Sequence, residues 1–228
     1  MTPQAQANDP MNVSLEVGTK RVFACVLDWP GWCRSGKNEE QALDAVAAYA
    51  ERYAAVAREA GVAFPDAQAV DFQVVERLPG TAGHTDFGAP GEVATSDWDP
   101  LTAEEAARLA MLVKAAWAVF DQVAASAPAD LRKGPRGGGR DRDGMIDHVL
   151  GAEAAYARKL GITRRLPTRD DTRAIAALRD AIVAALKAPS HGTPRVPKGW
   201  PPRYAARRIA WHVLDHAWEM EDRSDTAR

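Results

Sequence analysis

Two histidines near the end of the sequence, His212 and His216, have a spacing that suits shared metal binding. On a helix, residues four positions apart lie one turn apart on the same face. Ile209, Val213 and Met220 share this face, so both imidazoles are expected in an apolar stripe, where polar groups need partners. Two neutral imidazoles arranged in this way can bind one metal ion. The pair alone is weak evidence, because such pairs more often have a structural or surface role.

A third histidine, His148, strengthens the metal interpretation. It lies early in a helix predicted over about residues 145–160, and packed helices can bring it opposite the His212/His216 pair. Three histidines, with the remaining positions held by water or substrate, make the open type of site found in metalloenzymes. The alternative is that His148 caps its helix or forms a local hydrogen bond. Carboxylates that could fix the imidazole tautomers from an outer shell are Glu153, Asp215 and Glu219.

The elements that must position these rings are helices. The first predicted helix begins near Thr102, with Glu105 in the capping-box position, and the others cover about residues 145–160, 170–187 and 203–222. Each has an apolar stripe, and loops rich in glycine, proline or charge separate them. We therefore predict an all-α antiparallel four-helix bundle over residues 101–228. The remaining histidines, His84 and His191, fall in irregular loops, where a solvated or capping role is expected.

Two stretches of this half carry a family resemblance. DHVLGAEAAYARKLG, residues 147–161, and AWHVLDHAWEMEDR, residues 210–223, resemble the DinB/YfiT-like superfamily. In that family a four-helix bundle carries one histidine on its second helix and a His-x-x-x-His pair on its last, which match His148, His212 and His216. The resemblance covers about residues 100–228 and implies a divalent metal, namely nickel, zinc or iron.

Some members of the superfamily are thiol-dependent S-transferases or isomerases that use bacillithiol, mycothiol or glutathione. The resemblance therefore also implies a low-molecular-weight thiol as a second cofactor. It does not define the substrate, and it leaves the catalytic residues unknown.

The first half of the chain has a different pattern. Apolar runs at residues 13–17 and 21–28 predict two strands joined by a hairpin at Gly18-Thr19, and Trp29-Pro30-Gly31-Trp32 ends the second strand. A helix is predicted from the cap Asn38 to about Gly61, followed by a strand near residues 70–74. We predict a β-β-α-β domain of the α+β class over residues 11–80. Residues 1–10 are expected to be a disordered tail, and residues 81–100 a linker.

This half is similar to HicB-like domains in its sequence VFACVLDWPGWCRSGKNEEQALDAVAAYAERY. The family pattern places a strand, a D-x-P-G turn, a glycine and a helix at Asp28, Pro30, Gly31, Gly36 and Glu40. HicB-like domains are usually antitoxin modules that bind a small RNase. The sequence has no recognisable DNA-binding tail, so we interpret the domain as an accessory or lid domain.

Composition excludes several other classes of function. Lys+Arg 29 against Asp+Glu 31 gives a formal charge of −2, which offers no reason to expect nucleic acid or a membrane surface as a partner. No apolar run is long enough to span a bilayer, and MTPQAQANDP lacks the regions of a secretory signal. Two cysteines are too few for a disulfide framework, and Cys33 is expected to be more accessible than Cys25. A cytoplasmic protein is predicted.

Two hypotheses about function follow. The first is a metal-dependent enzyme acting on a small molecule, in which the metal activates a thiol or water or polarises a substrate oxygen. The second is a non-catalytic binding or stress-response module with a structural or vestigial metal site. The stripe of Trp211, Leu214 and Trp218, opposite the histidine face, predicts a further interface with the first domain or with a second copy in a homodimer.

Overall fold

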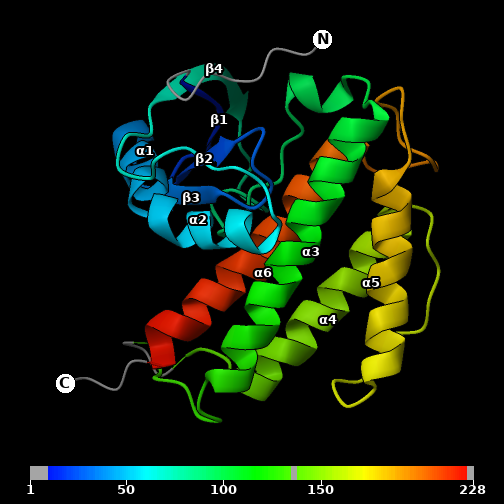
Figure 1. Cartoon of the computed structure of the whole chain (residues 1–228). Coiled ribbons are helices and arrows are strands. Elements are labelled where there is room, and N and C mark those ends of the chain that lie inside the picture. Colours follow the sequence, from blue (N-terminus) through cyan, green and yellow to red (C-terminus); the bar gives the residue numbers. More distant parts are fainter. Residues whose placement is uncertain (1–9, 135–137, 225–228) are drawn as a thin grey trace.

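The computed structural model describes residues 10–134 and 138–224 of the chain. It has a mixed α+β fold, with a small sheet and two helices from the first part of the chain and four long helices from the rest (Figure 1). The predicted α+β class is therefore confirmed. Most of the predicted tail lies outside the described residues.

The sheet contains four strands, which are β1 (Met11–Val17), β2 (Val22–Val26), β3 (Cys33–Gly36) and β4 (Phe72–Pro79). Their order is β3-β2-β1-β4, with β1 antiparallel to β2 and parallel to β4. The predicted hairpin between the first two strands is present, and the backbone N–H of Gly18 donates to the carbonyl of Arg21. The predicted β-β-α-β order is wrong, because the chain reverses between Val26 and Cys33 and adds β3 beside β2.

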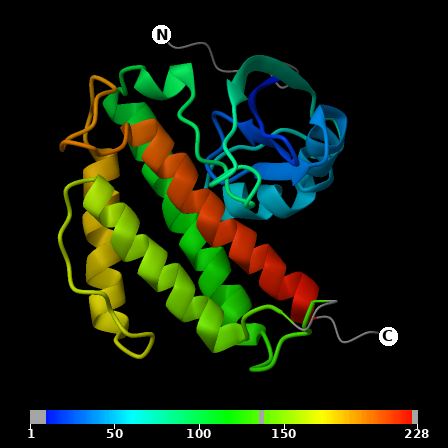
Figure 2. The same ribbon diagram turned by 180° about the vertical axis from the view of Figure 1, so that it is seen from behind.

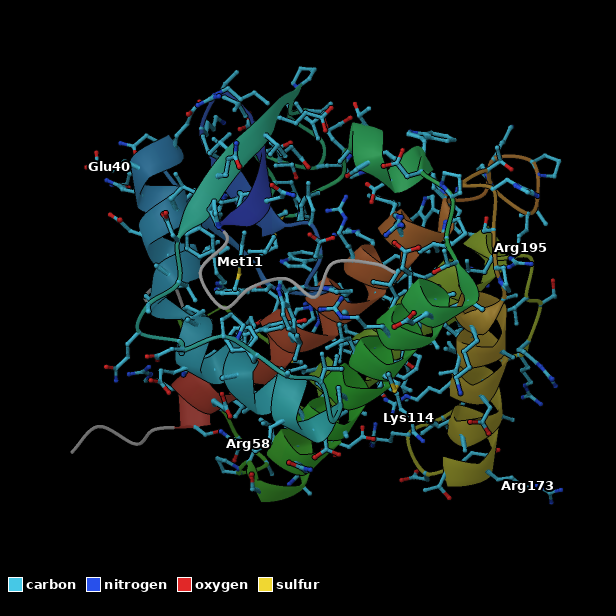
Figure 3. The ribbon with its side chains drawn as sticks, turned by 45° about the horizontal axis from the view of Figure 1, so that its top comes forward. Met11, Glu40, Arg58, Lys114, Arg173 and Arg195 are labelled. Carbon is cyan, nitrogen blue, oxygen red and sulfur yellow. A yellow bond between two sulfur atoms is a disulfide. The ribbon has the colours of Figure 1, made fainter. Side chains whose placement is uncertain are left out.

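Two short helices stand where one was predicted, namely α1 (Glu39–Ala48) and α2 (Ala50–Glu59). The predicted cap is confirmed, since the side chain of Asn38 accepts a hydrogen bond from the backbone N–H of Gln41 at 2.8 Å. The helical path is interrupted at Tyr49, whose backbone has φ −97° and ψ 4°. The N-terminal part is thus β-β-β-α-α-β. Its charged side chains Glu40 and Arg58 lie at the outer surface (Figure 3).

The cysteines pair in a way that the sequence analysis did not anticipate. Cys25 of β2 and Cys33 of β3 lie directly opposite each other and form a disulfide. Both are buried against Phe23 and Trp211, and Cys33 is only 4% exposed. The expectation of an accessible Cys33 is therefore wrong, because β3 turns this side chain towards the helices.

The segment of residues 81–100 is held by buried polar contacts. The carboxylate of Glu16 accepts hydrogen bonds from the hydroxyl of Thr85 and from the backbone N–H groups of Gly91 and Glu92. Within the segment, the 3-10 helix η1 (Thr95–Trp98) carries Asp97, which pairs with the buried Arg207. This predicted linker therefore bonds to the sheet at one end and to the helices at the other.

Four long helices complete the fold, namely α3 (Ala103–Ser126), α4 (Arg142–Lys159), α5 (Thr172–Lys187) and α6 (Pro202–Ser224). Their bounds agree closely with the predicted helices, and Thr102 and Glu105 form the expected capping box. Both α3 and α4 pack against α6 and α5. By length and composition α3 could cross a membrane, but 50% of its apolar window is buried inside the fold.

The helix α6 lies beside the sheet-containing part as well as beside α3 and α4 (Figure 2). Trp211 packs against Phe23, and Trp218 against Tyr49, with ring centroids 6.1 Å and 5.0 Å apart. Gly31 (φ 92°) sits against α6 so closely that a β-carbon there would lie 2.7 Å from Leu214. The stripe predicted to form an interface is covered by the N-terminal part of the same chain.

Candidate metal centre

The three helical histidines converge where α4 packs against α6. His212 and His216 lie one turn apart on α6, and His148 comes from the second turn of α4. One ligand atom from each ring lies within 4.8 Å of those of the other two. The Nε2 atoms of His148 and His212 are 3.2 Å apart, and the ring centroids are 4.7 to 5.0 Å apart. The packing of two helices thus brings together rings that are 64 residues apart in sequence.

A carboxylate fixes one of the rings. The Nδ1 atom of His216 lies 3.0 Å from a carboxylate oxygen of Glu219, whose other oxygen accepts from Arg223 at 2.7 Å. A bond at Nδ1 leaves Nε2 of His216 as the free donor for a metal, which is the usual role of an outer-shell carboxylate. Of the three predicted carboxylates, only Glu219 has this role.

The other two predicted carboxylates bind elsewhere. Glu153 forms an ion pair with Arg179 on α5 at 3.2 Å, and Asp215 pairs with Arg34 of β3 at 2.7 Å. Their assignment to the outer shell is therefore wrong. Asp215 instead joins the helix of the histidine pair to the sheet.

The electrostatics of the centre favour the neutral form of two imidazoles, those of His148 and His212. Burial lowers the pKa of His148 to about 4, and the charges of His216 and Arg140 act in the same direction. Burial also lowers the pKa of His212 well below its usual range. The hydrogen bond with His216 and the neighbouring Arg223 lower the pKa of Glu219, which is therefore ionised near neutral pH. Neutral imidazoles beside an ionised carboxylate are the protonation states that metal binding requires.

The residues fit a metal ion in chemistry and nearly in geometry. Two nitrogens bound to one ion at about 2.1 Å can lie at most about 4.2 Å apart. Two ligand nitrogens at the 4.8 Å limit of the cluster would have to approach each other by about 0.6 Å to bind the same ion. A small rotation of one ring is enough for this. The buried Nδ1 atom of His212 has no hydrogen-bond partner within the described residues, and its Nε2 atom faces that of His148.

Two further side chains border the centre and were not singled out from the sequence. The ring of Tyr156 on α4 lies 5.6 Å from that of His212, and the guanidinium of Arg208 lies 5.6 Å from the Tyr156 ring. Burial raises the pKa of Tyr156, and the charge of Arg208 opposes this shift. Helical spacing could have found both, since Arg208 precedes His212 by four residues and Tyr156 follows His148 by eight.

The histidines of the loops lie apart from this centre. His84 is exposed, with its Nδ1 atom 3.4 Å from the hydroxyl of Thr81, and His191 is exposed as well. Neither belongs to a group of possible metal ligands among the described residues. Of the loop that joins α3 to α4, residues 135–137 lie outside the described residues.

A cavity of about 590 Å³ lies between α3, α4 and α5 and contains no histidine. A hollow of about 310 Å³ between β2, β3 and α6 includes Glu219 and Arg223. The histidine centre therefore borders the second of these spaces through its outer-shell carboxylate. We place the candidate chemistry at the histidines, because volume alone identifies no reacting group.

Comparisons with known proteins add no assignment: no protein-family profile, curated protein or solved structure matches the chain. The functional argument therefore depends on the residues of this chain.

Proposed function

We propose that this protein is a divalent-metal-dependent enzyme of the DinB-like type that acts on a small molecule. In this proposal, residues 101–228 are an antiparallel four-helix bundle that carries the metal, and residues 11–80 are a HicB-like accessory domain. The pairwise packing of α3 and α4 against α5 and α6 supports the bundle.

The observation that carries the proposal is the convergence of His148, His212 and His216 within 4.8 Å, where burial lowers the pKa of His148 and His212. Nickel, zinc or iron would be held by the three rings. A bound ion of this kind lowers the pKa of a thiol or water, or polarises a substrate oxygen. A three-histidine set leaves coordination positions for that ligand, which suits a thiol-dependent S-transferase or isomerase.

The chain's own groups around the centre have separate tasks. Glu219 holds the tautomer and orientation of His216, and Arg223 holds Glu219. Tyr156 stays protonated near neutral pH, so its hydroxyl can donate a hydrogen bond beside His212. Trp200 packs on Tyr156 with a centroid distance of 5.0 Å and restricts solvent on that side.

Metal analysis of the purified protein tests the proposal. Protein prepared without chelators and incubated with Ni²⁺, Zn²⁺ or Fe²⁺ is expected to retain one equivalent after desalting. His148→Ala, His212→Ala and His216→Ala should each lose it, whereas the exposed His191→Ala should retain it. Wild-type protein without stoichiometric metal would overturn the proposal. A screen of low-molecular-weight thiols with the loaded protein then tests the reaction class.

The non-catalytic alternative loses part of its support. It drew on Trp211, Leu214 and Trp218 as a surface for partners, and these side chains are buried against the N-terminal part of the chain. A homodimer through this stripe is thus disfavoured, and the oligomeric state stays a prediction. Stable co-purification with a protein partner, unaffected by chelation, would favour the alternative.

We also propose a cytoplasmic location, supported by the balanced charge and the half-buried apolar window of α3. The Cys25–Cys33 disulfide points the other way, because such bonds persist mainly in oxidising compartments. Rapid alkylation of thiols in intact cells decides between them: two free cysteines indicate a reducing compartment, and an intact disulfide contradicts a cytoplasmic location.

A further inference from the structure

One arginine of α6 differs from the others in its partners. Arg203, Arg207 and Arg223 each form an ion pair with a carboxylate, from Glu105, Asp97 and Glu219 respectively. Arg208 pairs with no carboxylate within residues 10–134 and 138–224. Its Nη1 atom is buried and has no hydrogen-bond partner among the residues that the structure describes. One donor of this guanidinium is therefore removed from water without an acceptor, which costs free energy unless a ligand supplies one.

Arg208 lies at one end of the histidine centre. It precedes His212 by one helical turn, so both residues occupy the same face of α6. Its guanidinium carbon lies 4.6 Å from the ring centroid of Trp211 and 5.6 Å from that of Tyr156. The two aromatic rings hold the guanidinium beside the centre, while the side chain as a whole is only partly buried and can meet a ligand from solvent.

A second cation, Arg140, lies near the centre and pairs with no carboxylate in the described part of the chain. The exposed Arg140 precedes α4, and its backbone carbonyl accepts from Arg223 at 2.7 Å. Arg223 in turn holds Glu219, so Arg140 is tied to the outer shell of the centre. Its charge acts on both His148 and His212. Among the described residues, the carboxylate bonded to the centre is that of Glu219, which is already shared between His216 and Arg223.

We propose that the histidine centre takes a small carboxylate-bearing anion, whose carboxylate binds Arg208 while Arg140 adds long-range attraction. This inference rests on the proposed function, and it names the substrate class for the same site. A carboxylate suits Arg208 because a planar guanidinium donates two parallel hydrogen bonds to it. Bound metal would add further positive charge, which an anionic ligand would offset.

A pair of matched probes tests this proposal without knowledge of the substrate. Nicotinate and nicotinamide both offer a pyridine nitrogen to a metal and differ in that one carries a carboxylate and the other a neutral amide. Protein loaded with Co²⁺ reports their binding through its visible absorption spectrum at low ionic strength. Isonicotinate and isonicotinamide repeat the comparison with a different reach between nitrogen and carboxylate.

Wild-type protein is expected to bind the carboxylate of at least one pair about tenfold more tightly than the amide, as a charge-assisted hydrogen bond provides. Arg208→Met keeps an apolar side chain over Tyr156 and removes the charge, so this preference should fall to about one. Arg208→Lys should restore part of it. Arg158→Met, which removes an exposed charge from α4, is the matched control and should keep the wild-type preference.

The outcomes separate this inference from the proposed function. Protein that takes up no Co²⁺ overturns both. Protein that binds Co²⁺ and the amides, but shows no preference for the carboxylates or keeps it in Arg208→Met, overturns this inference and leaves the metal site intact. A loss of preference in Arg208→Met with unchanged affinity for the amide supports it, since a merely structural defect would weaken both probes.

Discussion

Removal of the carboxylate of Glu219 should weaken metal binding, although this side chain would contact His216 and not the metal itself. Glu219 lies 3.0 Å from Nδ1 of His216, and it is the only predicted outer-shell carboxylate that contacts a histidine of the centre. Loss of such a partner typically lowers metal affinity by about 10- to 100-fold. Because the side chain of Glu219 is 38% exposed, solvent screens part of its charge, and we expect about tenfold, the lower end of that range.

The assay is a competition titration with a chelator of known affinity, carried out with Glu219→Ala and Glu219→Gln. The glutamine keeps an acceptor for His216 and should lose less affinity than the alanine. Asp215→Asn is the matched control, because Asp215 lies on the same helix but bonds Arg34 at 2.7 Å. Equal metal affinity in Glu219→Ala and wild type would refute the outer-shell role. A comparable loss in Asp215→Asn would instead indicate an effect of overall charge.

Three further predictions concern stability. Asp97→Ala leaves the buried Arg207 without its counter-charge and should lower the free energy of unfolding, measured in urea, by about 3–5 kcal/mol. Adding Arg207→Met should recover part of this loss, and a double variant whose two losses simply add would contradict the coupling. Reduction of the Cys25–Cys33 bond, which closes a loop of 8 residues, should lower the free energy of unfolding by about 2.5 kcal/mol. An unchanged urea midpoint in the presence of dithiothreitol would contradict this prediction. Gly31→Ala places a β-carbon against α6 at a positive φ and should lower the free energy of unfolding by about 1–3 kcal/mol in the same measurement. An unchanged free energy of unfolding would show that the turn relaxes.

Sequence predicted most of the long helices because their signals are local. Thr102 and Glu105 define the start of α3 through a capping box that a reader of the sequence can recognise. The short strand β3 lacked such a signal, since four residues, CRSG, show no clear alternation and depend on pairing with β2. The interruption at Tyr49 was also invisible, because the apolar spacing continues through it.

The candidate site divides in the same way. The common face of His212 and His216 follows from helical periodicity, whereas the approach of His148 depends on how α4 packs against α6. The choice among carboxylates follows from rotation about the helix. Glu219 is three residues from His216 and shares its face, whereas Asp215 is adjacent in sequence and points about 100° away, towards the sheet.

The position of α6 between the sheet and the other long helices has a consequence for any attempt to divide the chain. The helix α6 supplies two of the three imidazoles. It also packs against the N-terminal part through Trp211, Leu214 and Trp218. A fragment without residues 1–80 would present these large apolar side chains to water, which favours self-association. A ligand or partner that displaces the N-terminal part would therefore change the packing on the tryptophan face of α6. Because the histidines lie on the opposite face of the same helix, the affinity of the centre for its ligand should change as well.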